Sequence, residues 1–423
     1  MSIHRLLFII ILFLFSCEKQ DVFSIIDQGY LPKIEITIDD YHLWSPDSGL
    51  YVIGINGAEM CGPIANYNQN WEFPASIKYI ENNSTLFDEK IGLKIKGYCS
   101  RIKPMKSFGL YFRGEYGNPI LNYPVFKNLN VSSYKRLFLR NAGSDFGYTH
   151  IKDISVVSIV KDYANFEYQE YNQCVVYLNN EYWGIYNLRE MITPHYFQYH
   201  FGIPKDNIDL LEGSELTPIA DDGSIDDYIN NVVSFIQTHD LSNDNHYEHI
   251  ANTIDVNSYI DYIIVNTYIG NWDWPHRNIK WWRDRTNDNS KWRWILFDTD
   301  AGFNLKRVEN VWIGDLFGDA SAFHNDDGSF YLFNHLIKNR GFKQLFLNQY
   351  LYYIEHVFSQ DRVRSLIKMN MATISPEYDN FRMKWNVLSK SDWENEIDNM
   401  ITFNQQRVYI MEKIINQLID ENN

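Results

Sequence analysis

The sequence GNWDWPHRN at residues 270–278 and the sequence WILFDTD at residues 294–300 decide which fold we expect for this chain. The first stretch places Asp273 five residues before Asn278, and the second places Asp298 directly after an apolar, strand-like run. Sites that transfer phosphoryl groups present a catalytic Asp, a metal-binding Asn and a metal-binding Asp in this order. The two stretches therefore predict a site for a metal ion and a nucleotide.

Asp273 and Asn278 belong to a segment that contains Pro275 and follows a helix-like run. Because proline interrupts regular structure, we expect both side chains on a loop, where they can converge on a ligand. In a phosphoryl-transfer loop the Asp accepts or orients the proton of the attacking hydroxyl, and the Asn gives an oxygen to a metal ion. The alternative is that Asp273 and Asn278 only cap turns.

Asp298 and Asp300 follow the apolar run and are separated by Thr299. If the backbone stays extended there, both carboxylates point to the same side. Hard divalent ions such as Mg²⁺ and Mn²⁺ favour oxygen ligands of this type. We therefore predict metal binding by Asp298 and Asp300, with the alternative that each carboxylate only accepts backbone N–H groups at the end of a strand.

A nucleotide also needs cations for its phosphates, and residues 101–107 supply three of them between two expected strands. Arg101 lies on the connecting loop, while Lys106 enters the second strand and could reach the phosphate oxygens. Glu190 is a candidate to orient Lys106, although it could instead pair with Arg189 or Lys205. The alternative for each lysine on this loop is a solvated surface position.

Composition and charge exclude several classes of function. The chain has 423 residues, is 45% hydrophobic and carries a formal charge of −16, so it can fold around more than one core but lacks the basic character of a nucleic-acid-binding protein. It contains no H-E-x-x-H pair, no G-x-S-x-G elbow, no Walker A loop and no G-x-G-x-x-G run. We expect no nucleic-acid partner and no zinc hydrolase.

The N-terminus predicts export. A positive start precedes an apolar run at residues 6–15, which is too short to span a bilayer as a helix. Ser16 and Cys17 then look like a bacterial lipobox, so we expect residues 1–17 to be a lipoprotein signal peptide and residues 18–30 a tether. Lipidation of Cys17 would anchor the chain to the cell envelope, with the outer membrane as the expected site; a noncleaved anchor is the alternative.

Three cysteines remain, namely Cys61, Cys99 and Cys174. Their spacing matches no zinc motif. One disulfide could form in an oxidising compartment, but the sequence does not select the pair.

The order of the elements predicts an α+β fold with two lobes. Strand-like patterns dominate the first half, and apolar residues at helical spacing dominate the chain after about residue 225. Residues 31–85 read as a small β-rich region. The strands expected in the first half are residues 34–38, 51–55, 76–80, 91–97, 108–112, 136–139 and 175–178, with helices at residues 151–160, 229–236 and 256–268.

Four stretches in this order resemble the spore-coat CotH kinase family. They are residues 97–108, 139–141, 177–190 and 270–300. Phe403 and Arg407 resemble a further family feature, and residues 31–51 resemble the opening of lipoprotein members. Asn179-Asn180 stands where the family usually has Asn-Gly, a departure at a turn.

The resemblance implies an atypical two-lobed protein-kinase-like fold over residues 86–420, preceded by the β-rich region. It also implies ATP and Mg²⁺ or Mn²⁺ as cofactors, and a protein whose Ser or Thr is phosphorylated. Carried onto this chain, Lys106 would contact phosphates, Asp273 would serve the catalytic-loop role, and Asn278 and Asp298 would bind metal, with Asp300 as an auxiliary carboxylate.

Two other interpretations stay open at this point. The chain could be a noncatalytic surface lipoprotein, similar to a pseudokinase, that binds a protein or a glycan through its many aromatic residues. It could also be a glycosyltransferase in which residues 298–300 form a D-x-D metal motif for a sugar nucleotide, but that interpretation gives Asp273 and Asn278 no role.

Overall fold

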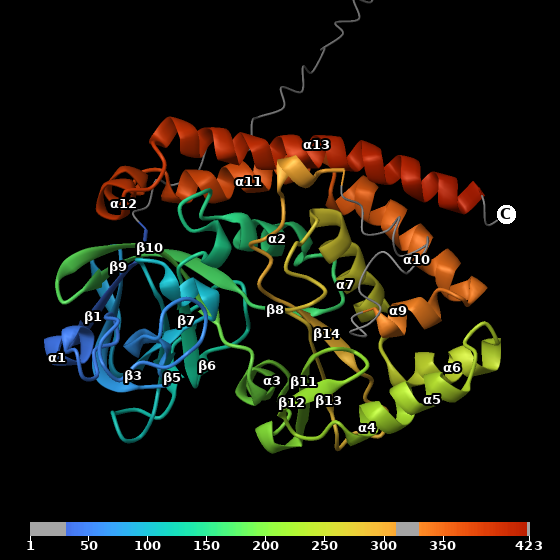
Figure 1. The fold of residues 1–423 in the computed structure, drawn as a ribbon, viewed down its shortest axis with the longest axis horizontal. Helices are drawn as coiled ribbons and strands as arrows, with labels where there is room; N and C mark the ends of the chain where they lie inside the picture. Colours follow the sequence, from blue (N-terminus) through green and yellow to red (C-terminus); the bar gives the residue numbers. More distant parts are fainter. Residues whose placement is uncertain (1–30, 310–329, 421–423) are drawn as a thin grey trace, which may run out of the picture. The chain divides into compact units, whose positions relative to one another are not determined.

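The computed structural model describes residues 31–309 and 330–420. The expected signal peptide at residues 1–17, the tether at residues 18–30 and the lipidation site Cys17 lie outside these ranges. Among the described residues, mixed helix and sheet confirm the predicted α+β class (Figure 1).

The first half of the chain forms a closed barrel. Its neighbours pair antiparallel, except that the first strand pairs parallel with the strand that closes the barrel. The strands, in spatial order, are β1 (Lys33–Ile38), β2 (Phe73–Glu81), β3 (Ser84–Lys96), β4 (Ser107–Tyr111), β7 (Arg136–Arg140), β10 (Glu181–Glu190) and β9 (Tyr171–Leu178).

The alternation of buried and more exposed side chains along the first strand shows which of its faces points into the barrel. In β1 the side chains of Ile34, Ile36 and Ile38 are buried while their neighbours are partly or fully exposed, as the sequence predicts for residues 34–38. The barrel encloses this apolar face, while β4 and most of β10 are buried on both faces. Because β1 and β2 pair with β3 and β9, residues 31–85 share one sheet with the strands that follow them.

The strand expected at residues 51–55 is not formed. Gly54 has a left-handed backbone with φ of +62°, and the Asn66 side chain lies where a Cβ of Gly54 would stand. Asn66 also donates its backbone N–H to the Ile53 carbonyl at 2.7 Å. These contacts turn the chain, and Ile53 and Ile55 remain exposed.

A second, five-stranded sheet is built from β8 (Glu167–Tyr168), which precedes the last two barrel strands, and from four strands that follow the barrel. The short helix α3 (Pro194–Phe201) packs on it through Phe197, whose ring centroid is 4.2 Å from that of Trp282. In spatial order its strands are β12 (Pro218–Asp222), β11 (Ile208–Gly213), β13 (Lys280–Asp284), β14 (Arg293–Leu296) and β8. β5 (Leu121–Asn122) and β6 (Ser133–Tyr134) form a separate ribbon.

Helix α7 is buried along nearly its whole length and forms the centre of the helical half. The Asp255 side chain caps its start by accepting the Ser258 N–H at 3.1 Å, and Gly270, with φ of +61°, ends it. The principal helices are α2 (Lys152–Val160), α7 (Val256–Ile269), α10 (Arg340–Tyr352), α11 (Gln360–Ile374), α12 (Tyr378–Trp385) and α13 (Lys390–Asp420).

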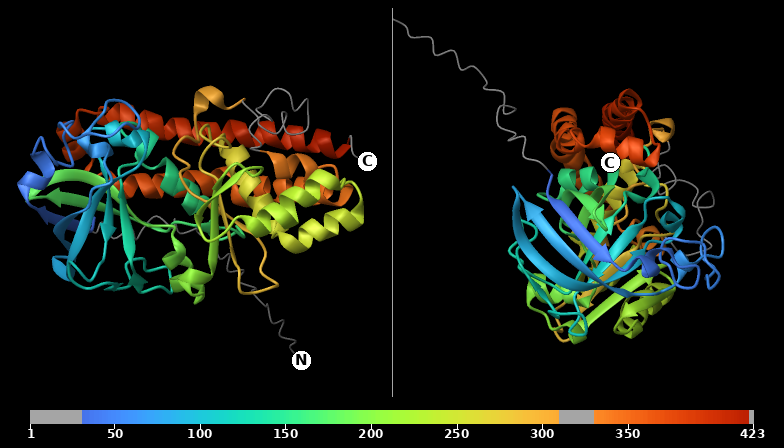
Figure 2. Two further views of the ribbon diagram at one scale, coloured as in Figure 1. Left: turned by 60° about the horizontal axis from the view of Figure 1, so that its bottom comes forward. Right: turned by 90° about the vertical axis from the view of Figure 1, so that its left-hand side faces the viewer.

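The long helix α13 lies alongside α11 and also contacts α10 and α12, while α12 packs on strand β10 of the barrel (Figures 1 and 2). The remaining helices are short: α1 (Asp40–Trp44), α4 (Asp226–Tyr228), α5 (Ser234–Thr238), α6 (Asp244–Thr253) and α9 (Tyr331–Leu336). None of the helices in the described ranges is both long and apolar enough to cross a membrane.

Cys61 and Cys99 form a disulfide, and Cys174 is a buried free thiol. The bond joins the loop before β2 to the connection between β3 and β4, two segments 38 residues apart in sequence. The sequence left this pairing open, because nothing in the spacing of the cysteines shows which loops meet.

Candidate active site

The loop at residues 271–278 follows directly from the end of α7 and is held by its own side chains. Asn271 donates its side-chain N–H to Asn266 Oδ1 at 2.9 Å, and the buried Trp274 donates its indole N–H to the Tyr262 hydroxyl at 2.9 Å. Asp273 lies half-buried between these two anchors. Hydrogen bonds on both sides of Asp273 therefore fix the position of this loop.

Asn278 and Asp298 bring two separate loops together. Asn278 Nδ2 donates to the Asp298 carbonyl at 3.4 Å, and both residues have left-handed backbones, with φ of +63° and +56°. Asn and Asp adopt left-handed conformations more readily than other residues with a Cβ, which suits them to these loop positions. The expected neighbourhood of Asn278 and Asp298 is thus present in the fold.

Arg140, at the end of β7, binds both carboxylates of the second loop. Its guanidinium forms ion pairs with Asp298 and Asp300, and its Nε lies 3.5 Å from a carboxylate oxygen of Asp153 on α2. Arg140 is 11% exposed at the side chain and Asp300 2%, whereas Asp298 is 33% exposed. Asp298 is therefore the carboxylate of this cluster that a ligand can approach.

Asp153 links helix α2 by hydrogen bonds to the loop that carries Asp298 and Asp300. Its carboxylate accepts the Thr299 N–H at 3.0 Å and the Thr299 hydroxyl at 2.9 Å, and it forms an ion pair with the buried Arg189. Strands β7 and β10, helix α2 and the loop after β14 thus meet around five charged side chains.

The surroundings shift the pKa values of this cluster. Burial alone would lower the pKa of Arg140, but Asp298, Asp300 and Asp153 outweigh it and raise that pKa, so the guanidinium stays charged. Burial and the neighbouring charge of Asp298 raise the pKa of Asp300. The pKa of Asp273 is also raised, first by burial and then by Asp298, which means that the charge of Asp298 acts on Asp273.

Gly143 allows the loop after β7 to approach Asp300. Its φ is +57°, and a Cβ at this position would lie 2.1 Å from Asp300 Oδ2. The next residue, Ser144, donates its backbone N–H to the same oxygen at 3.1 Å. A glycine is required here because both the backbone conformation and the close contact exclude a side chain.

Arg101 and Lys106 do not face the carboxylate cluster. Lys106 Nζ donates to the Arg101 carbonyl at 2.6 Å and lies 3.9 Å from the centroid of the Tyr67 ring, while Arg101 donates to the carbonyls of Gly97 and Tyr67 at 2.6 and 2.9 Å. Burial, and then Arg101, lower the pKa of Lys106 to about 8. In this structure both cations hold their own loop together.

Glu190 does not pair with Lys106, because the two residues occupy different levels of the barrel. The Lys106 carbonyl accepts the Tyr186 hydroxyl at 2.8 Å, and Glu190 lies four residues beyond Tyr186 on β10, about 13 Å further along the strand. Glu190 instead binds His200 Nε2 at 2.6 Å and accepts the Glu170 N–H at 3.2 Å.

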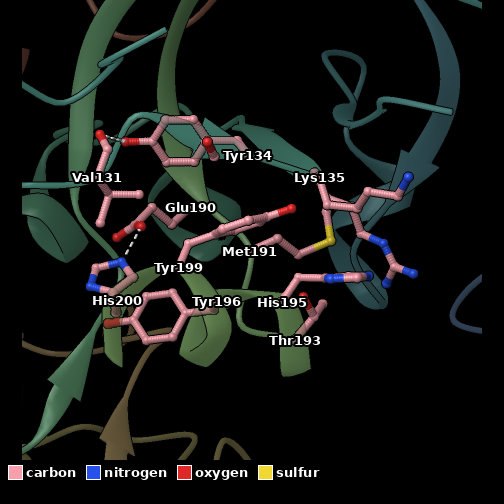
Figure 3. Close-up of a pocket in the computed structure, with 12 residues that line it drawn as sticks. Val131, Tyr134, Lys135, Glu190, Met191, Thr193, His195, Tyr196, Tyr199 and His200 are labelled. Carbon is pink, nitrogen blue, oxygen red and sulfur yellow. Dashed lines mark hydrogen bonds and ion pairs between the residues drawn. The ribbon is translucent and has the colours of Figure 1, made fainter. Parts of the chain in front are cut away.

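The space beside Glu190 is small. Figure 3 shows the carboxylate of Glu190 and the imidazole of His200 facing each other, with the Tyr196 ring stacked on His200 at 4.0 Å. The cavity encloses about 20 Å³, room for roughly one water molecule. These contacts fasten α3 to the end of β10 and leave no room for a nucleotide base.

A larger, polar cavity of about 240 Å³ lies between the barrel and the second sheet. Arg136 of β7 lines it from the barrel, Asp221 and Asp222 of β12 line it from the opposite side, and Thr193 and His195 line it where the chain leaves β10. Arg136 is four residues from Arg140, about 13 Å along the same strand. A ligand that lies along β7 could thus reach both the cavity and the carboxylate cluster.

The metal ion expected from the sequence is compatible with these residues. Asp298, Asp300 and Asn278 supply hard oxygen donors, which suit Mg²⁺ or Mn²⁺, and Mg²⁺ is commonly held by one or two carboxylates together with phosphates and water. Across residues 31–309 and 330–420, no group of three or more His, Cys, Asp or Glu side chains is placed to hold a metal ion. Phosphate and water would therefore have to complete the coordination.

The sequence assigned no role to Arg140, Asp153 or Lys96. Arg140 was visible as a cation at the end of an apolar strand, and Lys96 as the last polar residue of an alternating strand. Asp145 caps the segment that follows, because it accepts the N–H groups of Thr149 and Lys152 at 3.0 and 3.1 Å.

Comparisons with known proteins agree with the family resemblance. A sequence model described as "CotH kinase protein" matches residues 93–411. The crystal structure of a Helicobacter pylori proinflammatory kinase, CtkA, matches with 12% identity, covers 74% of this chain and 94% of its own, and has a TM-score of 0.33, too low to carry an argument about function. A search of curated proteins gives no match.

Proposed function

Because the chain belongs to the CotH kinase protein family, we propose that it transfers the terminal phosphoryl group of ATP to a Ser or Thr hydroxyl of a protein. The observation that carries this proposal is the meeting of Asn278, Asp298 and Arg140, which come from three separate segments of the chain. Two of these residues stand in the order that phosphoryl-transfer sites require.

Asp273 is the proposed catalytic residue. It is half-buried on a loop that Asn271 and Trp274 anchor, and its carboxylate would accept or orient the proton of the attacking hydroxyl. The charge of Asp298 raises the pKa of Asp273, after the larger effect of burial, which supports the assignment of both carboxylates to one site. Asn278 and Asp298 would hold Mg²⁺ or Mn²⁺, and Asp300 would assist them.

Arg140 and Asp153 correspond in geometry to the cation and the carboxylate that position phosphates in protein kinases. In those enzymes a strand-borne Lys pairs with a Glu of the neighbouring helix. Here Arg140 ends strand β7, and Asp153 lies on α2, the next helix, 3.5 Å from the Arg140 Nε. Arg140 would bind phosphate oxygens while Asp153, itself held by Arg189 and Thr299, orients it.

The cavity beside Arg136 is the proposed place for the nucleotide base. It lies about 13 Å along β7 from Arg140, so the phosphates would extend from the cavity toward Asp298. The Arg136 guanidinium could stack on an aromatic base. A metal ion bound at Asp298 would neutralise charge that develops on the phosphates during transfer.

Label transfer tests the proposal. The purified full chain, given ATP labelled on its terminal phosphate with Mn²⁺, should label itself or an added Ser-rich protein, and acid hydrolysis should return phosphoserine or phosphothreonine. The Asp298→Asn variant should lose at least about 100-fold in rate, and the exposed Asp288→Asn variant should not. Labelling by Asp298→Asn at the wild-type rate would refute the metal assignment.

A second candidate is a noncatalytic binding protein, and one observation favours it. Arg140 already neutralises part of the charge of Asp298 and Asp300, so the site does not depend on a metal ion for charge compensation. Calorimetry with ATP and Mn²⁺ separates the candidates, because only a nucleotide-binding protein should give a binding isotherm. A sugar nucleotide in the same experiment tests the D-x-D alternative.

We also propose that the protein is an exported lipoprotein of the bacterial envelope, anchored through Cys17. The sequence at residues 1–17 supports this, and the Cys61–Cys99 disulfide fits an oxidising compartment. In cells, the wild type should partition with membranes and the Cys17→Ala variant should not. A wild-type chain that remains with the soluble proteins would contradict the anchor.

A further inference from the structure

Three cations on the outer face of the barrel have no ion-pair partner within the described residues. Leu93 and Ile95 of β3 and Leu137 of β7 point into the core, so the alternating residues Lys94, Lys96 and Arg136 point outward. No hydrogen bond or ion pair joins these three side chains to another residue of the ranges 31–309 and 330–420. Lys94 and Arg136 instead lie over the Tyr111 ring, at 5.9 and 5.5 Å from its centroid, so the three form a group of positive charges without an ion pair in these ranges, on a strongly acidic protein.

Lys96 lies level with Arg140 on this face. Lys96 pairs with Ser107 of β4, and the next residue of β4, Phe108, pairs with Leu139 of β7. Lys96 and Arg140 are therefore separated by two strand spacings, about 10 Å, and side chains at one level of neighbouring strands point to the same side. The buried Ser107 of β4 lies between them at the same level.

Gly109 leaves the space that the stem of Lys96 occupies. A Cβ at Gly109 would lie 2.7 Å from Cε2 of the Tyr111 ring and 2.9 Å from Lys96 Cγ, so both side chains lie over this glycine. The lysine can therefore lie close over β4, in the direction of β7, instead of extending into solvent.

The charge of the Arg140 cluster makes additional cations favourable for a polyphosphate. Arg140 and Arg189 carry two positive charges against the three carboxylates of Asp153, Asp298 and Asp300. When all are ionised, the cluster has a net charge of −1 and repels an anionic phosphate chain. A divalent metal ion at Asp298 would offset this charge, and cations outside the cluster would further favour binding of the nucleotide.

The connection between β3 and β4 does not supply that charge. Kinases commonly cover the phosphates with a Gly-rich loop whose backbone N–H groups bind them, but this connection is closed by the Cys61–Cys99 disulfide. The donors of Arg101 and Lys106 are bound to backbone carbonyls of the same region. Lys96, directly before this connection, remains available.

We propose that Lys96, supported by Lys94, binds the phosphate chain of the nucleotide from the side opposite Arg140. This inference rests on the proposed function, because it assumes a polyphosphate at the Arg140 end of the barrel. Lys96 thus does with a side chain what a Gly-rich loop does with backbone N–H groups.

The charges around Lys96 predict a pH dependence. Burial, followed by the positive charges of Lys94, Arg101 and Arg136, lowers the pKa of Lys96 to about 8, while Asp221 of β12 acts in the opposite direction. An anion bound beside Lys96 favours its protonated form. Affinity for a polyphosphate should therefore fall as the pH rises past 8 in the wild type, because the free protein then loses the Lys96 proton.

Calorimetric titration of the full chain with inorganic tripolyphosphate and Mg²⁺ tests the inference at pH 7 and pH 9.5. At pH 7, Lys96→Gln should weaken binding about 10- to 100-fold, the value of a hydrogen bond to a charged group. Lys90→Gln is the matched control, since Lys90 is exposed on the same face of β3, six residues or about 20 Å away. Between pH 7 and pH 9.5, Lys96→Arg should lose less affinity for tripolyphosphate than the wild type loses. Because tripolyphosphate titrates in the same way with both proteins, the difference between them reports on Lys96.

Equal affinity of Lys96→Gln and Lys90→Gln for tripolyphosphate, or no binding by a folded wild-type protein, would overturn the inference. Protein labelling from ATP together with equal affinities would leave the proposed function standing and the inference wrong. A selective loss in Lys96→Gln without any protein labelling would support the inference and count against the kinase function. Thermal unfolding of each variant shows whether it is folded.

Discussion

Removal of the Arg140 guanidinium should destabilise the protein in a way that a divalent metal ion can reverse. In Arg140→Gln, Asp298 and Asp300 lose the cation that both contact, and Asp300 is 2% exposed at the side chain. Removing one partner of a buried pair costs about 3–5 kcal/mol, and the 33% exposure of Asp298 places the expected loss near the lower limit, about 3 kcal/mol.

The corresponding shift in Tm follows from the size of the folded unit. The compact unit spans residues 31–423, so about 390 residues at 2.1 cal/mol/K each give an unfolding entropy of roughly 0.8 kcal/mol/K. A loss of about 3 kcal/mol then lowers the Tm by about 4 °C. Arg364→Gln is the control, because its exposed ion pair with Asp361 should contribute less than about 1 kcal/mol.

Thermal unfolding with and without Mn²⁺ is the assay. Mn²⁺ should raise the Tm of Arg140→Gln by more than it raises that of the wild type, since the ion no longer competes with the guanidinium for Asp298 and Asp300. If the variant unfolds at the wild-type temperature in the absence of metal, or if Mn²⁺ raises both Tm values equally, Arg140 does not compensate the charge of these carboxylates.

Three further perturbations test other parts of the structure. Burial raises the pKa of Glu215 from its usual 4.5 to about 8, so the folded protein keeps a proton that the unfolded chain releases. The free energy of unfolding should therefore fall by about 1.4 kcal/mol per pH unit between pH 4.5 and 8. Glu215→Gln should remove this slope in urea titrations. Gly143→Ala should lower the free energy of unfolding by at least about 1 kcal/mol and reduce metal affinity, because the new Cβ meets Asp300. Reduction of the Cys61–Cys99 bond should lower the unfolding free energy by about 3–4 kcal/mol, the loop entropy for a separation of 38 residues.

Each of these three has an outcome that contradicts it. A slope in pH that persists in Glu215→Gln would place its origin in another group. Wild-type stability of Gly143→Ala would mean that the loop shifts without cost. Denaturation midpoints that coincide with and without reductant would show that the disulfide does not restrain the unfolded chain.

The sequence predicts the parts of the site that depend on local order. Asp273 and Asn278 lie on one short loop, and Asp298 follows a strand, so proline, spacing and apolar pattern were sufficient to place them at loop positions. The inward face of β1 was predictable for the same reason, since alternation of Ile with polar residues is a local signal.

Contacts between distant segments were not predictable in the same way. Arg140 meets Asp298 across 158 positions of sequence, and this meeting depends on how β7 and the loop after β14 pack. Glu190 does not pair with Lys106, one of the partners that the sequence left open, because β7 lies between β4 and β10 and it is Tyr186 of β10 that donates to the Lys106 carbonyl. A shift of one residue in the register of a strand changes which side chains meet, and a single sequence does not define that register.

The most direct test of the site is a crystal structure of the protein with Mn²⁺ and a nonhydrolysable ATP analogue, with the metal located by its anomalous signal. We predict an anomalous peak at a coordination distance of about 2.0–2.3 Å from a carboxylate oxygen of Asp298, with phosphate oxygens bound by Arg140 and the base beside Arg136. A nucleotide bound elsewhere, or a peak remote from Asp298, would contradict it.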